Sequence, residues 1–156
     1  MNKALLQQQV CQQLEADLAS LIAAAEAAHQ AATHEESKAE NKYDTRGLEA
    51  SYLAAGQSRR VADIRRALSA WRILQLRPYD DAIGIQLGAL VCLEAADGRR
   101  QRLLLGPDGA GLKLRDEQGE IVLISPHSPL GQQLLGKGPG DWIQVGQTRW
   151  QVLQAS

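Results

Sequence analysis

The sequence predicts an α+β fold in which an N-terminal antiparallel helical hairpin is followed by a small β-sheet domain with one short helix. Residues 2–32 contain no Gly or Pro and are rich in Ala, Leu, Gln and Glu, which are good helix formers. Two segments share a spacing of three and four residues between apolar positions, and after Pro78 the apolar residues alternate instead. We place the hairpin in residues 1–76, with its tip near 35–43, and the second domain in residues 77–156.

Composition and charge exclude several classes of function. The 156 residues carry a formal net charge of -1, so the chain lacks the basic field of a duplex DNA-binding protein. No apolar run is long enough to span a membrane, and the N-terminus lacks a signal-type apolar core. Cys11 and Cys92 lie far apart and outside any metal-ligand spacing, which favours two reduced thiols over a disulfide. These features predict a cytoplasmic protein with neither a membrane nor duplex DNA as partner.

The helical half contains two matched apolar seams. Seam residues recur at steps of three and four in residues 11–32, and again in residues 47–71 of a second helix predicted over about 37–74. In antiparallel order they form the pairs Leu14/Ile64, Leu18/Val61, Leu21/Gln57, Ala25/Ala54, Ala28/Ala50 and Ala32/Gly47. The residue numbers of each pair sum to 78 or 79, which places the turn near residue 39. Because the seam side chains shrink toward this turn, we expect the hairpin to narrow toward its tip.

The turn between the helices, residues 34–43, is polar and acidic. Ser37 and Glu40 form a capping box, in which each side chain accepts a hydrogen bond from the backbone N–H of the other residue. Thr33 and Glu36 have the same spacing, so the second helix begins at one of these two places. The tip carboxylates either serve as caps and solubilising charge, or coordinate a divalent cation such as Mg²⁺ that a partner also holds. The turn has too few ligands to hold a metal of its own.

The second domain shows strand and turn signals in a regular order. Alternating apolar residues, separated by turns such as residues 97–98, predict its strands. The predicted strands are residues 89–94, 100–105, 112–114, 121–124, 142–145 and 150–153. Residues 128–137 predict a short helix, with Ser128 as the N-cap, Pro129 at the first helical position and Gly136 as the C′ residue.

Two stretches of the second domain resemble the bacterial Gre transcript-cleavage factors, GreA and GreB. Residues 124–137, followed by Gly-Asp at 140–141, are similar to the family's C-terminal signature. That signature is a strand ending at Ser, a Ser-Pro helix start and a Leu-hydrophobic-Gly-Lys exit. Residues 106–111 resemble the family's Gly-x-Asp-Glu-Ala-Asp element, with Gly109 and Gly111 in place of two acids. A helical hairpin before this domain also matches, so the resemblance covers nearly the whole chain.

The resemblance implies a fold, a partner and two sites. The second domain would have an FKBP-like fold and dock, through Ser128 and Pro129, on RNA polymerase at the rim of its secondary channel. The hairpin tip would enter the channel. In the family, tip acids in an Asp-x-x-Glu-Asn pattern followed by Tyr help to bind a second Mg²⁺ and a water, and the polymerase then hydrolyses backtracked RNA.

The tip of this chain matches the family pattern in two alternative alignments. Glu40, Asn41 and Tyr43 match when one residue is deleted before Tyr43, which puts Ser37 at the Asp position. Without the deletion, Glu36 takes the Asp position and Ala39 takes the Glu position. The resemblance therefore assigns Glu36, Glu40, Asn41 and Tyr43 to a site that shares the polymerase Mg²⁺ near the RNA 3′ end. The protein would hold no cofactor of its own and would not itself be an enzyme.

Three other functions remain as alternatives to stimulated cleavage. A Gre-like regulator would occupy the polymerase channel and modulate transcription without cleavage. A coiled-coil interaction module would use the hairpin to bind a protein unrelated to polymerase. A prolyl isomerase, which an FKBP-like fold suggests, is disfavoured because its aromatic pocket would have only Trp142, Trp150 and Tyr79 available.

Overall fold

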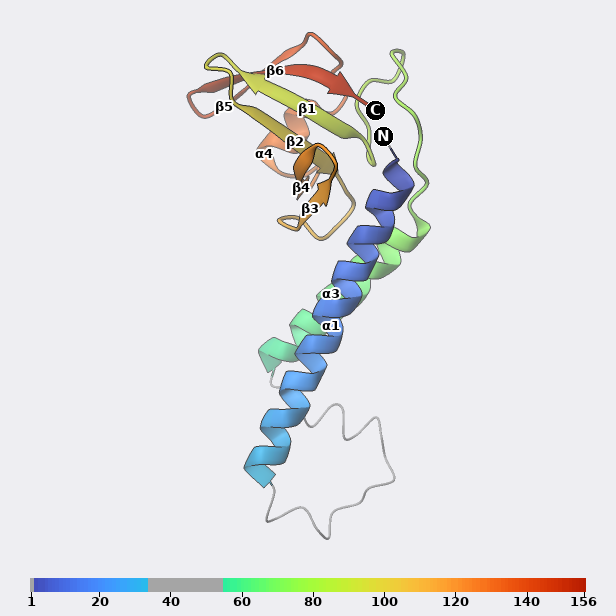
Figure 1. Ribbon diagram of the computed structural model, residues 1–156, viewed down its shortest axis with the longest axis vertical. Helices are drawn as coiled ribbons and strands as arrows, with labels where there is room; N and C mark the ends of the chain where they lie inside the picture. The colour runs from blue at the N-terminus through green and yellow to red at the C-terminus, as the bar shows by residue number, and fades with distance from the viewer. Residues whose placement is uncertain (1, 34–54) are drawn as a thin grey trace.

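The structure is a computed structural model that describes residues 2–33 and 55–156 (Figure 1). The predicted α+β class is confirmed. The described helices and strands are α1 (Lys3–Thr33), α3 (Ala55–Ile73), β1 (Leu90–Ala95), β2 (Arg100–Leu105), β3 (Lys113–Asp116), β4 (Gly119–Ile124), α4 (Pro129–Leu134), β5 (Trp142–Val145) and β6 (Thr148–Ala155). The predicted tip and the first part of the predicted second helix lie outside the described residues.

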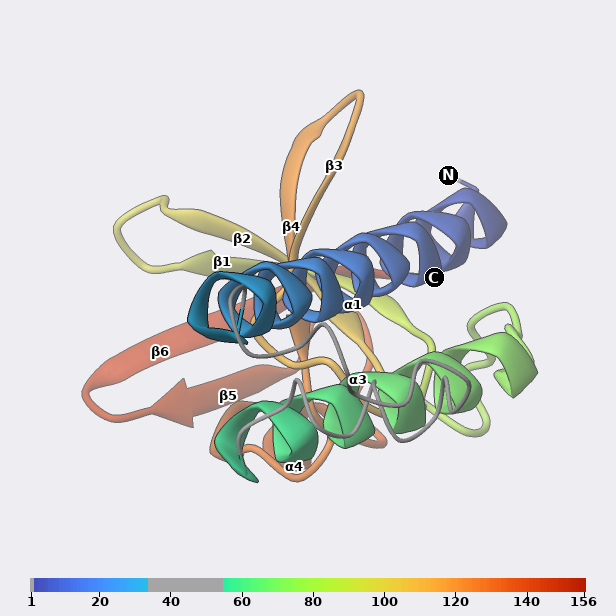
Figure 2. The same cartoon turned by 90° about the horizontal axis from the view of Figure 1, so that it is seen from below.

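Helices α1 and α3 lie side by side and run in opposite directions, as the matched seams predict (Figures 1 and 2). Leu14 and Ile64 are buried in a common core, and the half-buried Leu18 and Leu21 pack against it. Apolar side chains at the heptad spacing therefore join the described part of the hairpin. Ala28, which also belongs to the predicted seam, is exposed, and its predicted partner lies outside the described residues.

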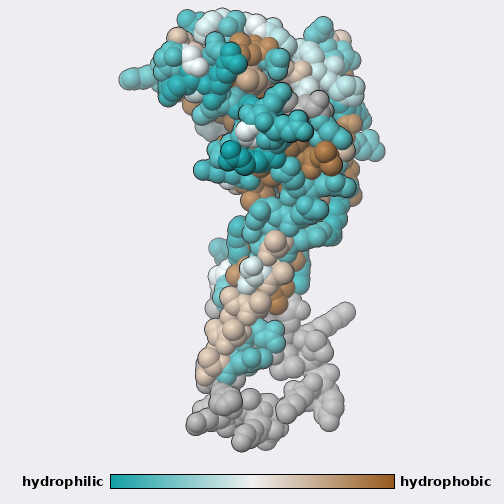
Figure 3. All heavy atoms as spheres, in the orientation of Figure 1, coloured by the Kyte–Doolittle hydropathy of each residue, from teal (hydrophilic) through white to brown (hydrophobic). Residues whose placement is uncertain are grey.

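The end of α1 that points away from the sheet exposes mainly small side chains. Its visible face is pale brown in Figure 3, because small apolar side chains replace the polar ones found nearer the sheet. The exposed alanines here are Ala23, Ala24, Ala27, Ala28 and Ala31. With 31 residues, α1 is about 45 Å long. The described part of α1 is thus a long helix whose far end carries small exposed side chains.

At its base, α1 caps the C-terminal end of α3. The Gln7 amide Nε2 donates to the carbonyl oxygens of Trp71 at 2.7 Å and of Leu74 at 3.0 Å. The Lys3 ammonium donates to the carbonyl oxygen of Arg77 at 2.6 Å. Carbonyls at a helix C-terminus have no partner within the helix, so the Gln7 bonds satisfy the carbonyls of Trp71 and Leu74 at the end of α3, and the Lys3 bond ties α1 to the segment that follows.

Six strands form one mixed sheet in the order β3-β4-β2-β1-β6-β5. Strands β2 and β4 pair in parallel, and the other neighbours pair antiparallel. The predicted strands at 100–105 and 142–145 have the observed bounds, and the ends of the other four differ by at most two residues. The turn between β1 and β2 contains Asp97 and Gly98, as predicted, and the φ of 88° at Gly98 explains the glycine.

The sheet separates two apolar cores. The first lies between the hairpin base and one sheet face, and the second lies between the other face and α4. Strand β1 serves both, because alternate side chains point to opposite faces: Leu90 belongs to the first core, and Val91 and Leu93 belong to the second. Segments on both sides of residue 77 build the first core, which therefore anchors the hairpin to the sheet.

Trp71 lies in the contact between the hairpin and the sheet. Its side chain is fully buried, and its indole Nε1 donates to the carbonyl oxygen of Asp108 at 2.7 Å. A Cβ atom on Gly106 would lie 2.2 Å from Cζ2 of the indole, so the ring packs against bare backbone. The turn that begins at Gly106 therefore forms the surface against which the Trp71 ring packs.

Arg102 in β2 and Asp116 at the end of β3 form a mostly buried ion pair on the sheet. Their two hydrogen bonds, Nη1 to Oδ1 and Nη2 to Oδ2, are both 2.6 Å long. This geometry is the strong bidentate form of an ion pair. Hydrogen bonding by Arg102, helped by the backbone N–H of Gln118, lowers the pKa of Asp116 from 3.8 to about 2.

We expect this ion pair to make stability depend on acidity. Because the pKa of Asp116 is lower in the folded chain, its contribution is complete above about pH 4 and is lost as the pH falls through about 2. Arg102→Gln should lower the free energy of unfolding at neutral pH by about 1 kcal/mol, since water screens part of the pair. It should also flatten the fall in stability between these two pH values. Urea denaturation across this pH range measures both effects.

The control for this prediction is Arg66→Gln. It removes an exposed ion pair with Asp63 on α3, where water screens both charges. The control should therefore leave the neutral-pH stability nearly unchanged. If Arg102→Gln keeps the acid dependence of the unmodified protein, the ion pair is not its source.

Strand β3 is one edge of the sheet, and α1 covers part of it. The side-chain amide of Gln9 bonds both backbone groups of Arg115: Nε2 donates to the carbonyl oxygen at 2.9 Å, and Oε1 accepts from the N–H at 3.4 Å. A glutamine side chain thus takes the place that a further strand would occupy at this residue.

Candidate functional site

The residues predicted for the hairpin tip, Glu36, Glu40, Asn41 and Tyr43, lie outside the described residues. Their roles at a shared Mg²⁺ therefore stay predictions. The structure does describe the helices that lead to the tip. The C-terminal end of α1 and the N-terminal end of α3 both lie away from the sheet (Figure 1).

Ser128 and Pro129 lie at the N-terminus of α4, and the predicted cap is confirmed. Ser128 Oγ accepts from the N–H of Gly131 at 3.0 Å and donates to the carbonyl oxygen of Ser125 at 2.7 Å. Pro129 is exposed in the first turn, where its missing N–H leaves no bond unmade. Polymerase docking by these two residues stays a prediction.

Glycines fix both ends of α4. A Cβ atom on Gly131 would lie 2.0 Å from the carbonyl oxygen of Ser125, so the helix approaches the preceding turn more closely than a side chain allows. Gly136 has a φ of 81° and follows the C-cap, which confirms its predicted C′ place. The N–H of Gly136 donates to the carbonyl oxygen of Ile85 at 2.9 Å, and the N–H of Ile85 donates to the carbonyl oxygen of Lys137 at 2.8 Å.

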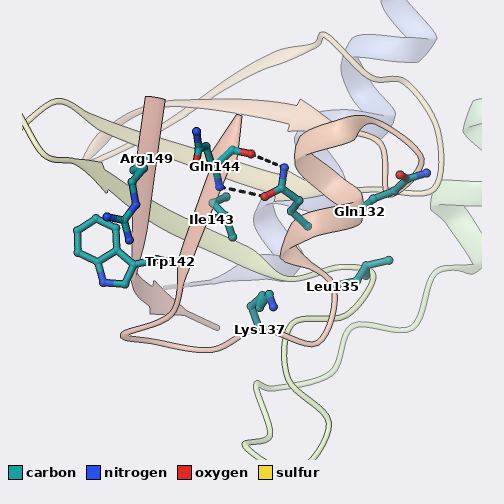
Figure 4. A pocket seen from close by; sticks show the side chains of 8 residues that line it. Gln132, Leu135, Lys137, Trp142, Ile143, Gln144 and Arg149 are labelled. Carbon is teal, nitrogen blue, oxygen red and sulfur yellow. Dashed lines mark hydrogen bonds between the residues drawn. The ribbon is translucent and has the colours of Figure 1, made fainter. Parts of the chain in front are cut away.

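Gln133 joins α4 to β5, the second edge of the sheet. Its Oε1 accepts from the backbone N–H of Gln144 at 2.9 Å, and its Nε2 donates to the carbonyl oxygen of the same residue (Figure 4). The two bonds set the spacing between the helix and the strand. The surface between α4 and β5 therefore has a defined shape before any partner binds.

A groove of about 370 Å³ opens between α4 and β5. The end of α4 and the turn after it contribute Gln132, Leu135 and Lys137, and the strands contribute Trp142, Gln144 and Arg149 (Figure 4). The exposed fractions are 42% for Leu135 and 46% for Trp142. The guanidinium of Arg149 lies 4.8 Å from the centroid of the Trp142 ring, within the range of a cation–π contact. The groove combines an exposed aromatic ring with two cations.

This groove was not predicted, because its residues converge only in the folded chain. One signal was nonetheless present in the sequence. Along β5, Ile143 is buried whereas Trp142 and Gln144 are exposed, which is the alternation of a strand with one solvent face. Trp142 therefore had to point outward once Ile143 was assigned to the core.

The described residues were compared with the expectations for metal ligands, membrane-spanning helices and cysteines. No group of three or more His, Cys, Asp or Glu side chains in residues 2–33 and 55–156 could hold a metal ion. In the same part of the chain, no helix is long and apolar enough to cross a lipid bilayer. Cys11 and Cys92 are both free.

Comparison with known proteins finds likeness among solved structures. No protein-family model and no curated protein matches the chain. The structure of GreA factor homolog 1 (Gfh1) of Thermus thermophilus is similar over 96% of this chain and 94% of its own, at 23% identity and a TM-score of 0.38. A structure of the transcription factor Gfh1 covers 96% of this chain and 92% of its own, at 24% identity and a TM-score of 0.37. The structure of Gfh1 of Thermus aquaticus covers 95% of this chain and 92% of its own, at 24% identity and a TM-score of 0.36.

Proposed function

We propose that this protein is a Gre-like transcription factor that binds bacterial RNA polymerase at the secondary channel and inserts its hairpin tip there. The observation that carries the proposal is the anchored hairpin. Its base shares a buried core with the sheet, while the far end of α1, a helix about 45 Å long in all, extends away with small exposed side chains. A slender projection held firmly by a second domain suits a narrow channel.

The second domain supports the docking half of this function. Residues 124–137, which carry the family resemblance, form a strand end, a Ser-capped helix and a Gly exit. Ser128 and Pro129 lie together at the start of α4, and this position supports the proposal that they contact the polymerase. Such a protein works in the cytoplasm, with RNA polymerase as its partner and no membrane or duplex DNA contact.

At the tip, we assign Glu36 and Glu40 to the coordination of a Mg²⁺ ion that the polymerase also holds. Carboxylate oxygens suit this hard cation, and the metal would stabilise charge as water attacks the backtracked RNA. Asn41 and Tyr43 would contact the RNA 3′ end beside it. The polymerase performs the hydrolysis, so this protein acts as a stimulating factor.

The experiment that tests this function has two stages. The purified protein is first titrated against bacterial core RNA polymerase, and absence of binding would reject the Gre-like function and favour an unrelated coiled-coil module. Stalled backtracked complexes are then incubated with Mg²⁺ and the protein, and shortening of the RNA is measured. Binding without shortening would leave the regulator that occupies the channel without cleavage.

Variants then locate the activity. The double change Glu36→Ala and Glu40→Ala should abolish stimulated shortening and leave polymerase affinity unchanged. Glu26→Ala is the matched control, because Glu26 is an exposed acid on α1 outside the tip. Equal loss of shortening in the control and in the double variant would contradict the assignment of the tip acids.

A further inference from the structure

The groove between α4 and β5 has the construction of a binding surface. The hydrogen bonds of Gln133 to the backbone of Gln144, here called the glutamine clamp, hold α4 against β5. Together with Gly131 and Gly136 at the two ends of α4, they set the shape of the groove before any partner binds. Binding to such a surface loses little conformational entropy, so more of the contact energy appears as affinity. The groove lies at the C-terminal end of α4, opposite the end where Ser128 and Pro129 lie.

Trp142 is the exposed aromatic residue of this groove. Its ring leaves nearly half of its surface in water, and it stacks on Arg149 at one end of the groove (Figure 4). Trp150, in the neighbouring strand, also has an arginine above its ring at 5.6 Å, but it is 8% exposed. Aromatic and arginine side chains that lose their water in a complex supply much of the energy of protein interfaces. Trp142 is therefore the natural anchor for a partner.

Charge defines the kind of partner. Lys137 and Arg149 are cations, and the other groove side chains are neutral. The nearest acid in sequence, Asp141, accepts a hydrogen bond from the backbone N–H of Gly138 at 2.8 Å. An occupant with carboxylates would pair with both cations, and an apolar side chain would cover the exposed ring of Trp142. Complementary charge of this kind steers encounter and selects the partner.

We infer that this groove docks an acidic segment of RNA polymerase in which an apolar or aromatic side chain is flanked by carboxylates. The inference rests on the proposed function and names the chemistry of its partner. Trp142 receives the apolar side chain, while Lys137 and Arg149 bind the carboxylates. The groove is thus a second contact, distinct from the predicted contact at Ser128 and Pro129.

The test compares the affinities of the full-length chain and its variants for bacterial core RNA polymerase. Trp142→Ala should weaken binding about tenfold or more. Lys137→Gln and Arg149→Gln should each weaken it several-fold and reduce its sensitivity to salt. Arg99→Gln is the matched control, because it removes the cation above Trp150 and leaves the groove intact, so its affinity should stay unchanged.

The outcomes separate this inference from the function on which it rests. If the unmodified protein does not bind polymerase, the proposed function fails. If it binds, and Trp142→Ala binds equally well, the groove is not a docking site. Circular dichroism checks the fold of each variant. If Trp142→Ala is not folded, Lys137→Glu decides, because Lys137 is exposed and reversing its charge should repel carboxylates. Unchanged affinity of that variant would overturn the inference.

Discussion

Trp71→Ala is expected to lower the free energy of unfolding by about 4 kcal/mol, the usual cost of removing a large buried aromatic side chain. Trp71 is fully buried, and its ring lies against the backbone of Gly106 while Nε1 bonds Asp108. Alanine leaves a cavity at the contact between the hairpin and the sheet. The loss is a large share of the stability of a small protein. Urea denaturation followed by circular dichroism measures it.

Trp71→Phe serves as the comparison for this result. Phenylalanine keeps much of the ring but removes the Nε1–H donor, so the carbonyl of Asp108 loses that hydrogen bond. We expect a loss of about 1–2 kcal/mol, which separates the hydrogen bond from the buried volume. If the two variants lose the same free energy, the hydrogen bond determines the effect, and our assignment of most of it to packing is wrong.

Gly131→Ala is expected to be nearly as damaging, although it adds only one methyl group. The added Cβ would lie 2.0 Å from the carbonyl oxygen of Ser125 and 2.9 Å from Cα of Pro126. These are backbone atoms, which cannot turn aside as a flexible side chain can. The Ser125 carbonyl also accepts from Ser128 Oγ, so opening the turn breaks the helix cap. We expect a loss of about 3 kcal/mol.

A matched glycine change tests this explanation. Gly56 lies in α3, and no described heavy atom comes within 4 Å of a Cβ built on it. Gly56→Ala should therefore raise the free energy of unfolding by about 0.5 kcal/mol, since alanine favours a helix. Thermal and urea denaturation of both variants gives the comparison. Similar stabilities would show that the close approach at Gly131 relaxes without cost.

Much of the fold was predictable because local chemistry determines it. Ser128 and Pro129 begin a helix by their own hydrogen-bonding and backbone properties, and Gly136 ends it by its positive φ. The strand positions followed from alternation of apolar residues. The antiparallel hairpin followed from the matched seams, of which the described part packs as expected at Leu14 and Ile64.

Long-range packing explains what was missed. The sequence contains no local signal for the parallel pairing of β2 with β4, which brings residues 103–105 beside residues 122–124. The packing of the Trp71 ring depends on a turn 35 residues further along the chain, at Gly106. The groove at Trp142 likewise needs α4, β5 and β6 together. The tip residues Glu36 and Glu40 lie outside the described residues, so that part of the site stays a prediction.

The glutamine clamps at the two edges of the sheet also affect how copies of this protein meet. An exposed edge strand offers free N–H and C=O groups on which a second molecule can add a strand, and this is a route to aggregation. Gln9 occupies both backbone groups of Arg115 on β3, and Gln133 occupies those of Gln144 on β5. Both edge strands are also only four residues long. Each edge is thus interrupted where another copy would pair, which favours solubility at high concentration.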